Sequence, residues 1–418
     1  MNYNDCDVFI FSLSRWDDKY SSPALSLAKE FAKNHRVFYI SHPFTIKDFV
    51  KDYNKLVISR RRSALAFGKD IYEEIGSFPN SLTAVTPKMT IPINWMPKSF
   101  VYDALLAINN RIVVSAIRKT IRDFKVKKFI YINSFDPYYA TKLPADIQPY
   151  VSVYQSIDDM EEAEYIARHG ARLEPKAVAD ADICIATSRE LTRIKSQYSE
   201  HTYLLPNAAD LSIFNKARMI RYPFPMELRG FEKRKVIGYT GNINEVRIHY
   251  DLLRKVALAH KDKVLLMVGP LNSNDYKDFG LDKIPNIVFT GGKDISELPY
   301  YLQHIDCALI PFLKNKLTKS IYPLKINEYL AAGKAVVATN FSEDIRSFSD
   351  VIEVAESDEA FIKLIDKAIE EDSPEKIAER VRVAESNTWA ARVEQFWEIV
   401  KAYKEEQAPV SVHQPINV

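Results

Sequence analysis

Short runs of β-branched and aromatic residues alternate with amphipathic stretches along most of the 418-residue chain. Such runs predict buried strands, and the stretches between them have the 3.6-residue spacing of helices. The alternation predicts a parallel sheet with helices on both faces, in two successive series. The expected strands are 7–11, 36–40, 127–132, 150–155, 182–187 and 202–206 in the first series, and 235–240, 264–270, 286–292, 306–312, 335–339 and 351–355 in the second.

A segment rich in proline and charge, residues 213–234, interrupts this rhythm, and we interpret it as an interdomain linker. We therefore expect an N-terminal domain over residues 1–212 and a C-terminal domain over residues 235–387. A helical pattern over 388–404 follows the complete second series, so we expect this helix to cross back to the first domain. Residues 405–418 lack periodicity, which predicts a loose tail.

Composition excludes several function classes. The 57 Lys and Arg residues nearly balance 55 Asp and Glu residues, whereas nucleic-acid binders usually carry a strong basic excess. We therefore expect no nucleic-acid partner. Glycine is scarce, with 11 residues in the chain, and neither G-x-x-x-x-G-K-[ST] nor G-x-G-x-x-G occurs. This disfavours P-loop ATPases and standard dinucleotide-binding folds.

Cysteine and histidine give no sign of a disulfide framework or a metal site. Cys6, Cys184 and Cys307 are widely spaced in apolar stretches, which is typical of buried thiols in a reducing compartment. The eight histidines lack metal-ligand spacing, and single ones such as His42 and His169 fit structural roles. Because the N-terminus lacks a signal-peptide pattern and no uninterrupted apolar run reaches about 18 residues, we expect a cytoplasmic protein.

Charge is unevenly placed along the chain. Between Arg36 and Lys128 there are 17 basic and 7 acidic residues, including Arg60–Arg62 and the run that begins at Arg118 and Lys119. One interpretation is an ordinary solvated face. The other is peripheral contact of the N-terminal domain with an anionic membrane, since each basic residue near the head groups contributes about 1 kcal/mol. An acidic excess in the last third of the chain favours the membrane interpretation.

Most glycines lie in the second half of the chain, where several follow the expected strands. Eight of the eleven come after residue 229, and Gly241, Gly269 and Gly291 each end a strand of the second series. In open parallel sheets ligands bind beyond the carboxyl ends of the strands. Glycine there lets the backbone approach a ligand closely. The pattern therefore predicts the nucleotide-binding side of a cleft in the second domain.

Three segments carry a resemblance to a known family. Residues 187–214 run from a Thr-Ser-x-x-Leu helix start to a Pro-Asn-x-x-Asp-x-x-x-Phe exit, and GYTGNINEVRIHYDLL and YPLKINEYLAAGKAVVAT follow later in the chain. In order and spacing they resemble GT-B glycosyltransferases of the GT4 type over most of residues 180–340, in a subgroup that acts in bacterial surface-polysaccharide synthesis, including teichuronic acid pathways. The resemblance implies an α/β protein of the GT-B fold, with two Rossmann-like doubly wound domains facing a central cleft.

The resemblance also implies a nucleotide-sugar donor, which we expect to be a UDP-sugar, and no further cofactor. In this family two glutamates eight residues apart contact the donor. Glu328 occupies the second position, where its carboxylate suits the ribose diol, but the first position falls on Ser320. The family has two cations after the first glycine; here Asn242 replaces one and Arg247 retains the other, so Lys325 is expected to supply the second.

Arg247 fits a surface residue of the next helix equally well. Backbone N–H groups at the start of the helix that holds Lys325 would suit a phosphate group. The expected donor-binding residues are Gly241, Asn242, Arg247, Gly269, Gly291, Ser320, Pro323, Leu324, Lys325 and Glu328.

Polar residues after two strands of the first series are candidates for the acceptor side. Asp158 and Asp159 follow strand 150–155. A carboxylate there fits the general base of an inverting transfer, a substrate ligand in a retaining enzyme, or a cap of the next helix. An Arg–Trp pair after the first strand suits an anionic group and a sugar ring. The expected acceptor-binding residues are Ser14, Arg15, Trp16 and Asp17.

Taken together, the sequence predicts a metal-independent glycosyltransferase that transfers a sugar to a hydroxyl of a glycan or lipid-linked acceptor at the inner membrane face. Two alternatives stay open. A sugar-nucleotide epimerase of the same fold would turn over its substrate without an acceptor. A non-catalytic nucleotide-sugar-binding scaffold would fit the departures at Ser320 and Asn242. A retaining or an inverting outcome is equally compatible with the sequence.

Overall fold

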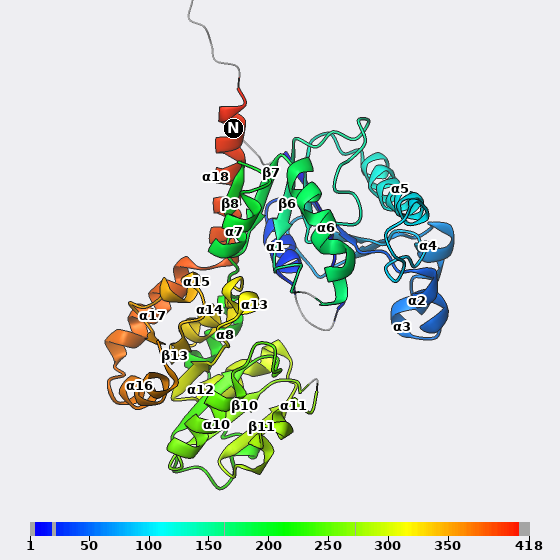
Figure 1. The fold of residues 1–418 in the computed structure, drawn as a ribbon. Coiled ribbons are helices and arrows are strands. Elements are labelled where there is room, and N and C mark those ends of the chain that lie inside the picture. The colour runs from blue at the N-terminus through cyan, green and yellow to red at the C-terminus, as the bar shows by residue number, and fades with distance from the viewer. Residues whose placement is uncertain (1–4, 19–21, 163, 272, 409–418) are drawn as a thin grey trace, which may run out of the picture. The chain divides into compact units, whose positions relative to one another are not determined.

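The computed structural model describes residues 5–18, 22–162, 164–271 and 273–408 (Figure 1). The chain forms two compact units, which we call unit 1 and unit 2. Each has its own sheet flanked by helices, which confirms the predicted α/β class. Unit 1 comprises Met1–Thr187, Leu191–Leu205 and Val393–Val418, and unit 2 comprises Ser188–Glu190 and Pro206–Arg392.

The sheet of unit 1 has the strand order β3-β4-β2-β1-β5-β6-β7-β8, and only the β3–β4 pair is antiparallel in the described residues. The two strands that the sequence pattern missed, β3 and β4, are short, and β3 is a polar edge strand. The strands are β1 (Asp7–Ser12), β2 (Val37–Ser41), β3 (Tyr72–Glu74), β4 (Leu82–Val85), β5 (Phe129–Ser134), β6 (Val151–Ser156), β7 (Ile183–Ala186) and β8 (Thr202–Leu204).

Helices cover this sheet and bring the end of the chain into unit 1. The first one begins as predicted, because Ser22 accepts a hydrogen bond from the N–H of Leu25 and Pro23 occupies the first turn. Near the C-terminus, Phe396 packs edge-on against Phe31, with ring centroids 5.2 Å apart. The helices are α1 (Pro23–Phe31), α2 (Ile46–Lys51), α3 (Leu56–Ser59), α4 (Arg62–Phe67), α5 (Phe100–Asp123), α6 (Glu164–Asp180), α7 (Arg189–Lys195) and α18 (Trp389–Glu406).

The sheet of unit 2 has the order β11-β10-β9-β12-β13-β14, and all its strands are parallel. The sequence pattern predicted each of them. They are β9 (Val236–Thr240), β10 (Val264–Val268), β11 (Ile287–Gly291), β12 (Cys307–Ile310), β13 (Ala335–Thr339) and β14 (Glu353–Ala355). The helices are α8 (Leu211–Phe214), α9 (Lys216–Met219), η1 (Met226–Leu228), α10 (Tyr250–Ala259), α11 (Asp275–Asp278), η2 (Leu281–Lys283), η3 (Ile295–Glu297), α12 (Leu298–Gln303), α13 (Lys316–Lys319), α14 (Leu324–Ala331), α15 (Glu343–Arg346), α16 (Asp358–Glu370) and α17 (Pro374–Ser386).

Residues 213–234, which we expected to be a linker, lie within unit 2. Phe214, Ala217 and Leu228 are buried in its hydrophobic core, and the side-chain amide of Gln303 donates to the carbonyl of Ala217 at 3.1 Å. The segment is rich in proline and charge, but the apolar side chains of its short helices anchor it to the core.

The strand order reverses once in each unit. In unit 1, β1 lies between β2 and β5, and in unit 2, β9 lies between β10 and β12. At such points the connections on either side of a strand diverge and leave room for a ligand beyond the carboxyl ends. The loops after β1, β2 and β5 in unit 1, and those after β9 and β12 in unit 2, are therefore where functional side chains are expected.

The three cysteines are buried free thiols, as the sequence indicated. Burial raises the pKa of Cys6 to about 11 and that of Cys184 to about 12. Burial also raises the pKa of Cys307, to well above the usual thiol range. All three remain protonated and unreactive near neutral pH, because the thiolate is the nucleophilic form.

Candidate functional site

Two glycines after β9 and β10 bring the backbone of unit 2 unusually close to a lysine. Gly241 has a φ of +137°, and a Cβ atom built there would lie 2.2 Å from Cε and 2.5 Å from Nζ of Lys325. Gly269 has a φ of +157°, and its Cβ would lie 1.8 Å from the carbonyl oxygen of Gly241. Neither position accommodates a side chain, so both glycines are required for the loops to pack against Lys325.

Gly291 is the last residue of β11 and has no such neighbour. Its φ is +72°, and a Cβ there would meet open space. At this position glycine is needed only because the backbone adopts the left-handed conformation. Of the three expected donor-site glycines, Gly241 and Gly269 are therefore required by close packing, whereas Gly291 is not.

Helix α14 carries Lys325 and Glu328 one turn apart, and its start has no side-chain cap. Pro323 occupies the N-cap position, so the first N–H groups of the helix, including that of Leu324, have no hydroxyl or carboxylate partner from the cap residue. Asn327, fully buried on the same helix, donates from its side chain to the carbonyl of Asn207 at 3.2 Å. That bond fixes α14 to the Pro-Asn motif that the sequence singled out.

Lys325 and Glu328 are charged groups in a poorly solvated place. Burial lowers the pKa of Lys325, with Glu328 opposing that shift and Arg247 adding to it. Burial raises the pKa of Glu328, and Lys325 opposes that rise. Glu328 is only 7% exposed. Within the described residues, neither the Lys325 ammonium nor the Glu328 carboxylate has a hydrogen-bond partner, so both are available to a ligand.

This arrangement suits an anionic ligand that also carries hydroxyl groups. An uncapped helix N-terminus and a nearby ammonium attract a phosphate, and a carboxylate accepts two hydrogen bonds from a vicinal diol. Arg247 is half-buried near enough to act on the pKa of Lys325, so it adds positive potential to the same place. Gly241, Gly269, Arg247, Lys325 and Glu328 are thus brought together.

Two other expected donor residues serve local structure. Ser320 is buried at the end of α13, where its hydroxyl donates to the carbonyl of Lys316 at 3.4 Å. Its own carbonyl accepts a hydrogen bond from the hydroxyl of Ser188 at 2.7 Å. Asn242 is exposed, and its carbonyl accepts a hydrogen bond from the phenol of Tyr239 at 3.1 Å.

In unit 1, Arg15 and Trp16, which follow β1, contact different groups of the protein. The guanidinium of Arg15 stacks on the ring of Phe44 at 3.9 Å and donates from Nε to the carbonyl of His42 at 3.3 Å. Burial is the main cause of the lowered pKa of Arg15. Ser14 accepts a hydrogen bond at its carbonyl from the phenol of Tyr39 at 2.9 Å. Arg15 and Ser14 therefore shape this loop.

Trp16 and Asp17 both contact the arginines of the segment 60–61. The guanidinium groups of Arg60 and Arg61 lie over the Trp16 ring, 5.0 and 5.5 Å from its centroid. Asp17 forms ion pairs with both arginines, at 2.8 Å for Arg61. Glu73 lies 3.8 Å from both guanidinium groups and supplies the second negative charge, so Asp17 is held in place within a neutral cluster.

Asp159 occupies a turn after β6. Its carboxylate accepts a hydrogen bond from the N–H of Glu161 at 3.1 Å, and its carbonyl accepts one from the N–H of Glu162 at 3.1 Å. These bonds close a local turn ahead of α6, which begins at Glu164, so the capping role of Asp159 for that helix stays a prediction. Asp158 precedes it in the same loop and is partly exposed.

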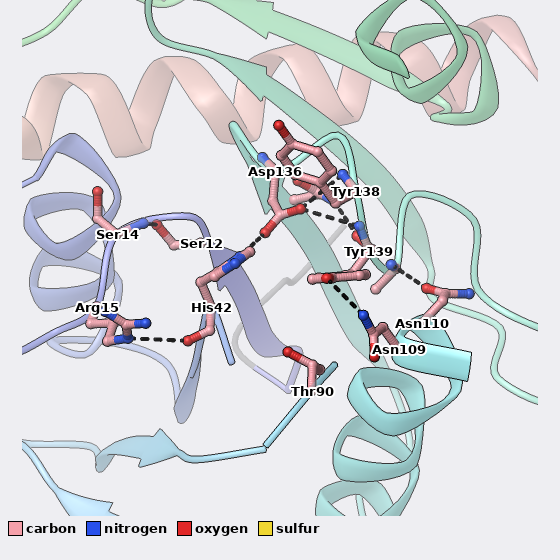
Figure 2. Close-up of polar contacts among 12 residues, drawn as sticks. Ser12, Ser14, Arg15, His42, Thr90, Asn109, Asn110, Asp136, Tyr138 and Tyr139 are labelled. Atoms are coloured by element: carbon pink, nitrogen blue, oxygen red, sulfur yellow. Dashed lines mark hydrogen bonds and ion pairs between the residues drawn. The ribbon is translucent and has the colours of Figure 1, made fainter. Parts of the chain in front are cut away.

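The structure shows a histidine–aspartate pair that the sequence did not reveal (Figure 2). Nδ1 of His42, after β2, lies 2.5 Å from Oδ2 of Asp136, after β5. The two residues flank β1, where the strand order of unit 1 reverses. Asp136 is fully buried while the His42 side chain is partly exposed. In the described part of the chain, Nε2 of His42 has no hydrogen-bond partner.

The loop that holds Asp136 is strained and tightly hydrogen-bonded. Phe135 and Ala140, on either side, have φ values of +62° and +51°, which cost free energy in residues other than glycine. The N–H groups of Tyr138 and Tyr139 donate to Oδ1 of Asp136 at 2.9 and 3.1 Å (Figure 2). One carboxylate oxygen is therefore fixed by the backbone, and the other is left for His42.

Sequence features could have indicated this pair. Ser-His-Pro follows strand 36–40 and Asn-Ser-Phe-Asp-Pro follows strand 127–132, so both place ionisable groups at strand ends next to the first strand. The absence of metal-ligand spacing around His42 instead predicts a structural role, which does not anticipate this contact. No group of three or more His, Cys, Asp or Glu residues able to hold a metal ion occurs among the residues that the structure describes.

Comparison with known proteins places these features in context. Residues 234–381 match the family model described as glycosyl transferases group 1. A protein of Bacillus subtilis (strain 168), assigned as the teichuronic acid biosynthesis glycosyltransferase TuaH, is 31% identical over 159 residues. That match covers 37% of this chain and 40% of the relative, so it spans less than half the relative's length.

Solved structures match over nearly the whole chain. Sucrose-phosphate synthase from Thermosynechococcus elongatus has a TM-score of 0.65 at 13% identity and covers 96% of this chain and 100% of its own. The UDP-forming α,α-trehalose-phosphate synthase of Burkholderia xenovorans, in complex with glucose-6-phosphate, has a TM-score of 0.67 at 9% identity, covering 94% and 100%. At these identities the match concerns the fold, which is GT-B.

Proposed function

Residues 234–381 are a group 1 glycosyltransferase domain within a GT-B fold, and from this premise we propose that the protein transfers a sugar from a nucleotide-sugar donor to a hydroxyl acceptor. The donor binds in unit 2. The acceptor is a glycan or a lipid-linked glycan of a bacterial surface polysaccharide.

The observation that carries this proposal is the unsatisfied pair on α14. Lys325 and Glu328 lack hydrogen-bond partners among the described residues. Because Gly241 and Gly269 have no side chains, the loops after β9 and β10 can pack against Lys325. A nucleoside diphosphate has a group for each: its phosphates pair with Lys325 and the helix N-terminus, and its ribose diol bonds to Glu328. Positive charge at this place also stabilises the departing diphosphate.

Two of the matched proteins support a uridine nucleotide. One is described as UDP-forming, and another, from E. coli, was solved with UDP-2-fluoro glucose bound, at a TM-score of 0.66 and 11% identity. The assignment of the Bacillus subtilis relative to teichuronic acid biosynthesis supports a surface-polysaccharide role. A cytoplasmic location at the inner membrane face fits both, since nucleotide sugars are cytoplasmic metabolites. No metal or further cofactor is part of the proposal.

On the acceptor side, we infer that His42 contacts the reacting hydroxyl. Asp136 holds Nδ1 and stabilises the imidazolium, so Nε2 is free to take the proton of the hydroxyl. The acceptor oxygen then bonds to the anomeric carbon, and the nucleoside diphosphate leaves with the electron pair of the broken C–O bond. Asp158 stays a further candidate, because it lies in the loop that follows β6, the strand beside β5.

A thermal-shift screen with nucleotides and nucleotide sugars, followed by a transfer assay, tests the proposed function. A ligand of the folded state raises the apparent melting temperature by mass action, so we expect UDP-sugars to do so. Product formation that requires an acceptor distinguishes a transferase from an epimerase, which would convert the sugar nucleotide alone. A stabilising ligand without turnover on any acceptor would instead favour the scaffold alternative.

A further inference from the structure

Exposed large apolar side chains concentrate in one part of unit 1. Nine of the 17 found in the described chain lie within residues 46–108. Four belong to α2, α3 and the turn between them: Ile46, Val50 (71% exposed), Tyr53 and Leu56 (75% exposed). Four more lie at or just before the N-terminal half of α5: Trp95 (69% exposed), Phe100 (87% exposed), Val101 and Ile108. We call these eight residues the apolar surface.

The two halves of the apolar surface belong to adjoining elements. The N–H of Ile46 donates to the carbonyl of Thr90 at 2.8 Å, and the side chain of Asn109 bonds to both backbone groups of Ile91 at 2.9 Å. Residues 90–91 therefore connect the start of α2 to α5. Figure 1 shows α2, α3, α4 and α5, in blue to cyan, gathered on one side of unit 1.

Helix α5 is apolar on more than the face that it buries. Its C-terminal half packs Val113, Val114 and Ile117 into the core of unit 1. Its best 18-residue window has a mean hydropathy of 1.4, enough for a membrane-spanning helix by length and composition, yet only 33% of that window is buried. Since the core contacts hold α5 within the fold, its exposed apolar half suits the surface of a membrane better than its interior.

Pairing of charges changes which cations face outward. The cations singled out in the sequence are largely neutralised: Arg60 and Arg61 pair with Asp17, Arg118 pairs with Asp146 at 2.8 Å, and Lys119 pairs with Asp123. Because these charges are already paired within the protein, they attract an anionic surface less strongly than unpaired cations do.

Other cations flank the apolar surface. Residues 46–69 and 88–111 contain ten Lys and Arg residues against three Asp residues. Within the described chain, Lys47, Lys51, Lys98 and Arg111 are exposed and have no acidic partner. Lys47 and Lys51 directly follow Ile46 and Val50 in sequence, so charge and apolar side chains alternate along the same short helix.

We propose that the apolar surface and its unpaired cations dock unit 1 on an anionic lipid bilayer. The apolar side chains enter the boundary between head groups and acyl chains, and the lysines contact the lipid phosphates. Amphipathic helices with basic flanks bind anionic bilayers in this way. Such docking brings the protein to lipid-linked acceptors, but it depends on no catalytic step and is measured without substrate.

Flotation of the full chain with phosphatidylcholine vesicles, with and without phosphatidylglycerol, tests the proposal. We expect the protein to float with the anionic vesicles. The double variants V50S/L56S and F100S/V101S, each at exposed positions, should reduce the bound fraction by about tenfold, because each removes two apolar anchors. The variant K47Q/K51Q should reduce it several-fold, and only on anionic vesicles.

Matched controls separate docking from general stickiness and unfolding. M219S/M226S alters two equally exposed apolar side chains in unit 2, and R118Q/K119Q removes two paired cations; both should float like the wild type. Far-UV circular dichroism confirms that each variant is folded. The proposal is overturned if the wild type stays in the soluble fraction, if the apolar-surface variants float unchanged, or if the unit 2 control loses binding equally.

Discussion

The imidazole of His42 and the carboxylate of Asp136 form a 2.5 Å contact at the carboxyl edge of the unit 1 sheet. Asp136 is buried and has its other oxygen fixed by two backbone N–H groups, so it orients the ring and leaves Nε2 available. Replacing His42 with Ala should lower the transfer rate constant by about 10²- to 10⁴-fold, the usual contribution of a general base. Steady-state kinetics measure this, and kcat should fall far more than the donor KM changes.

Two further measurements separate a proton acceptor from a merely structural histidine. Added imidazole should partly restore the rate of H42A, and D136N should lose activity while staying folded. Stereochemical analysis of the product should show inversion, as expected when a base on the acceptor side assists a single displacement. Full activity of H42A, or retention of configuration, would remove His42 from this role.

Gly241 tests the close packing at the donor site. In Gly241→Ala the new methyl group would collide with Cε of Lys325, so we expect the ammonium to move and nucleotide affinity to fall about tenfold or more, the effect of losing one charge-assisted hydrogen bond. Gly280→Ala is the matched control, because Gly280 also has a positive φ, +68°, but open space around it. Equal affinities of the two variants for UDP in calorimetric titrations would contradict the assignment.

The buried pair of Glu174 and Lys195 predicts where unit 1 is most sensitive to substitution. Lys195 Nζ lies 2.6 Å from the Glu174 carboxylate, and both side chains are buried. Lys195→Met should destabilise the protein by about 3–5 kcal/mol in urea unfolding, because the carboxylate is left buried and unpaired. Lys255→Met, which removes a surface partner of Asp358, should have little effect. An equal decrease in the free energy of unfolding in both variants would show that the buried pair contributes no more to stability than the surface pair.

Asp344 predicts a pH dependence of stability. Burial raises its pKa to about 6 despite the hydrogen bond from the N–H of Arg189. The folded state therefore holds a proton that the unfolded state releases at lower pH, so this group's contribution favours folding at acidic pH and is lost as pH rises from about 4 to 6. Relative to Asp344→Asn, the wild type should lose up to about 3 kcal/mol across that range.

Denaturant unfolding of both proteins at about pH 4 and pH 7 measures this difference at the two ends of the window. Since the comparison is between two variants at each pH, titration of the other groups cancels. An unchanged difference between the two proteins at the two pH values would show that Asp344 ionises normally in the folded state.

The sequence was sufficient to predict the longer strands of both sheets, because each of them is an apolar run and apolar runs of this length are buried in the core. It missed β3, which is a short polar edge strand, and β4, whose four buried residues form too short an apolar run to be distinctive. The linker prediction was misled by composition: Phe214 and Leu228 anchor residues 213–234 although charges and prolines surround them.

The candidate sites were predictable only in part. Gly241 followed from its place at a strand end, and Lys325 and Glu328 followed from the resemblance of residues 180–340 to a known family. The pair of His42 and Asp136 spans 94 residues, and Arg118 meets Asp146 across 28, so contacts of this kind depend on tertiary structure. For the same reason a count of charges could not reveal which cations are paired.

Isothermal titration of UDP, and of the nucleotide sugar that stabilises the protein most, into the wild type and the variants K325Q and E328Q tests the donor site most directly. We expect each substitution to weaken binding about 10- to 100-fold, since a hydrogen bond to a charged group contributes about 1.5–3 kcal/mol. Glu359→Gln, at an exposed position of unit 2, should bind like the wild type. Undiminished nucleotide affinity in both K325Q and E328Q would contradict the assignment of the donor site to α14.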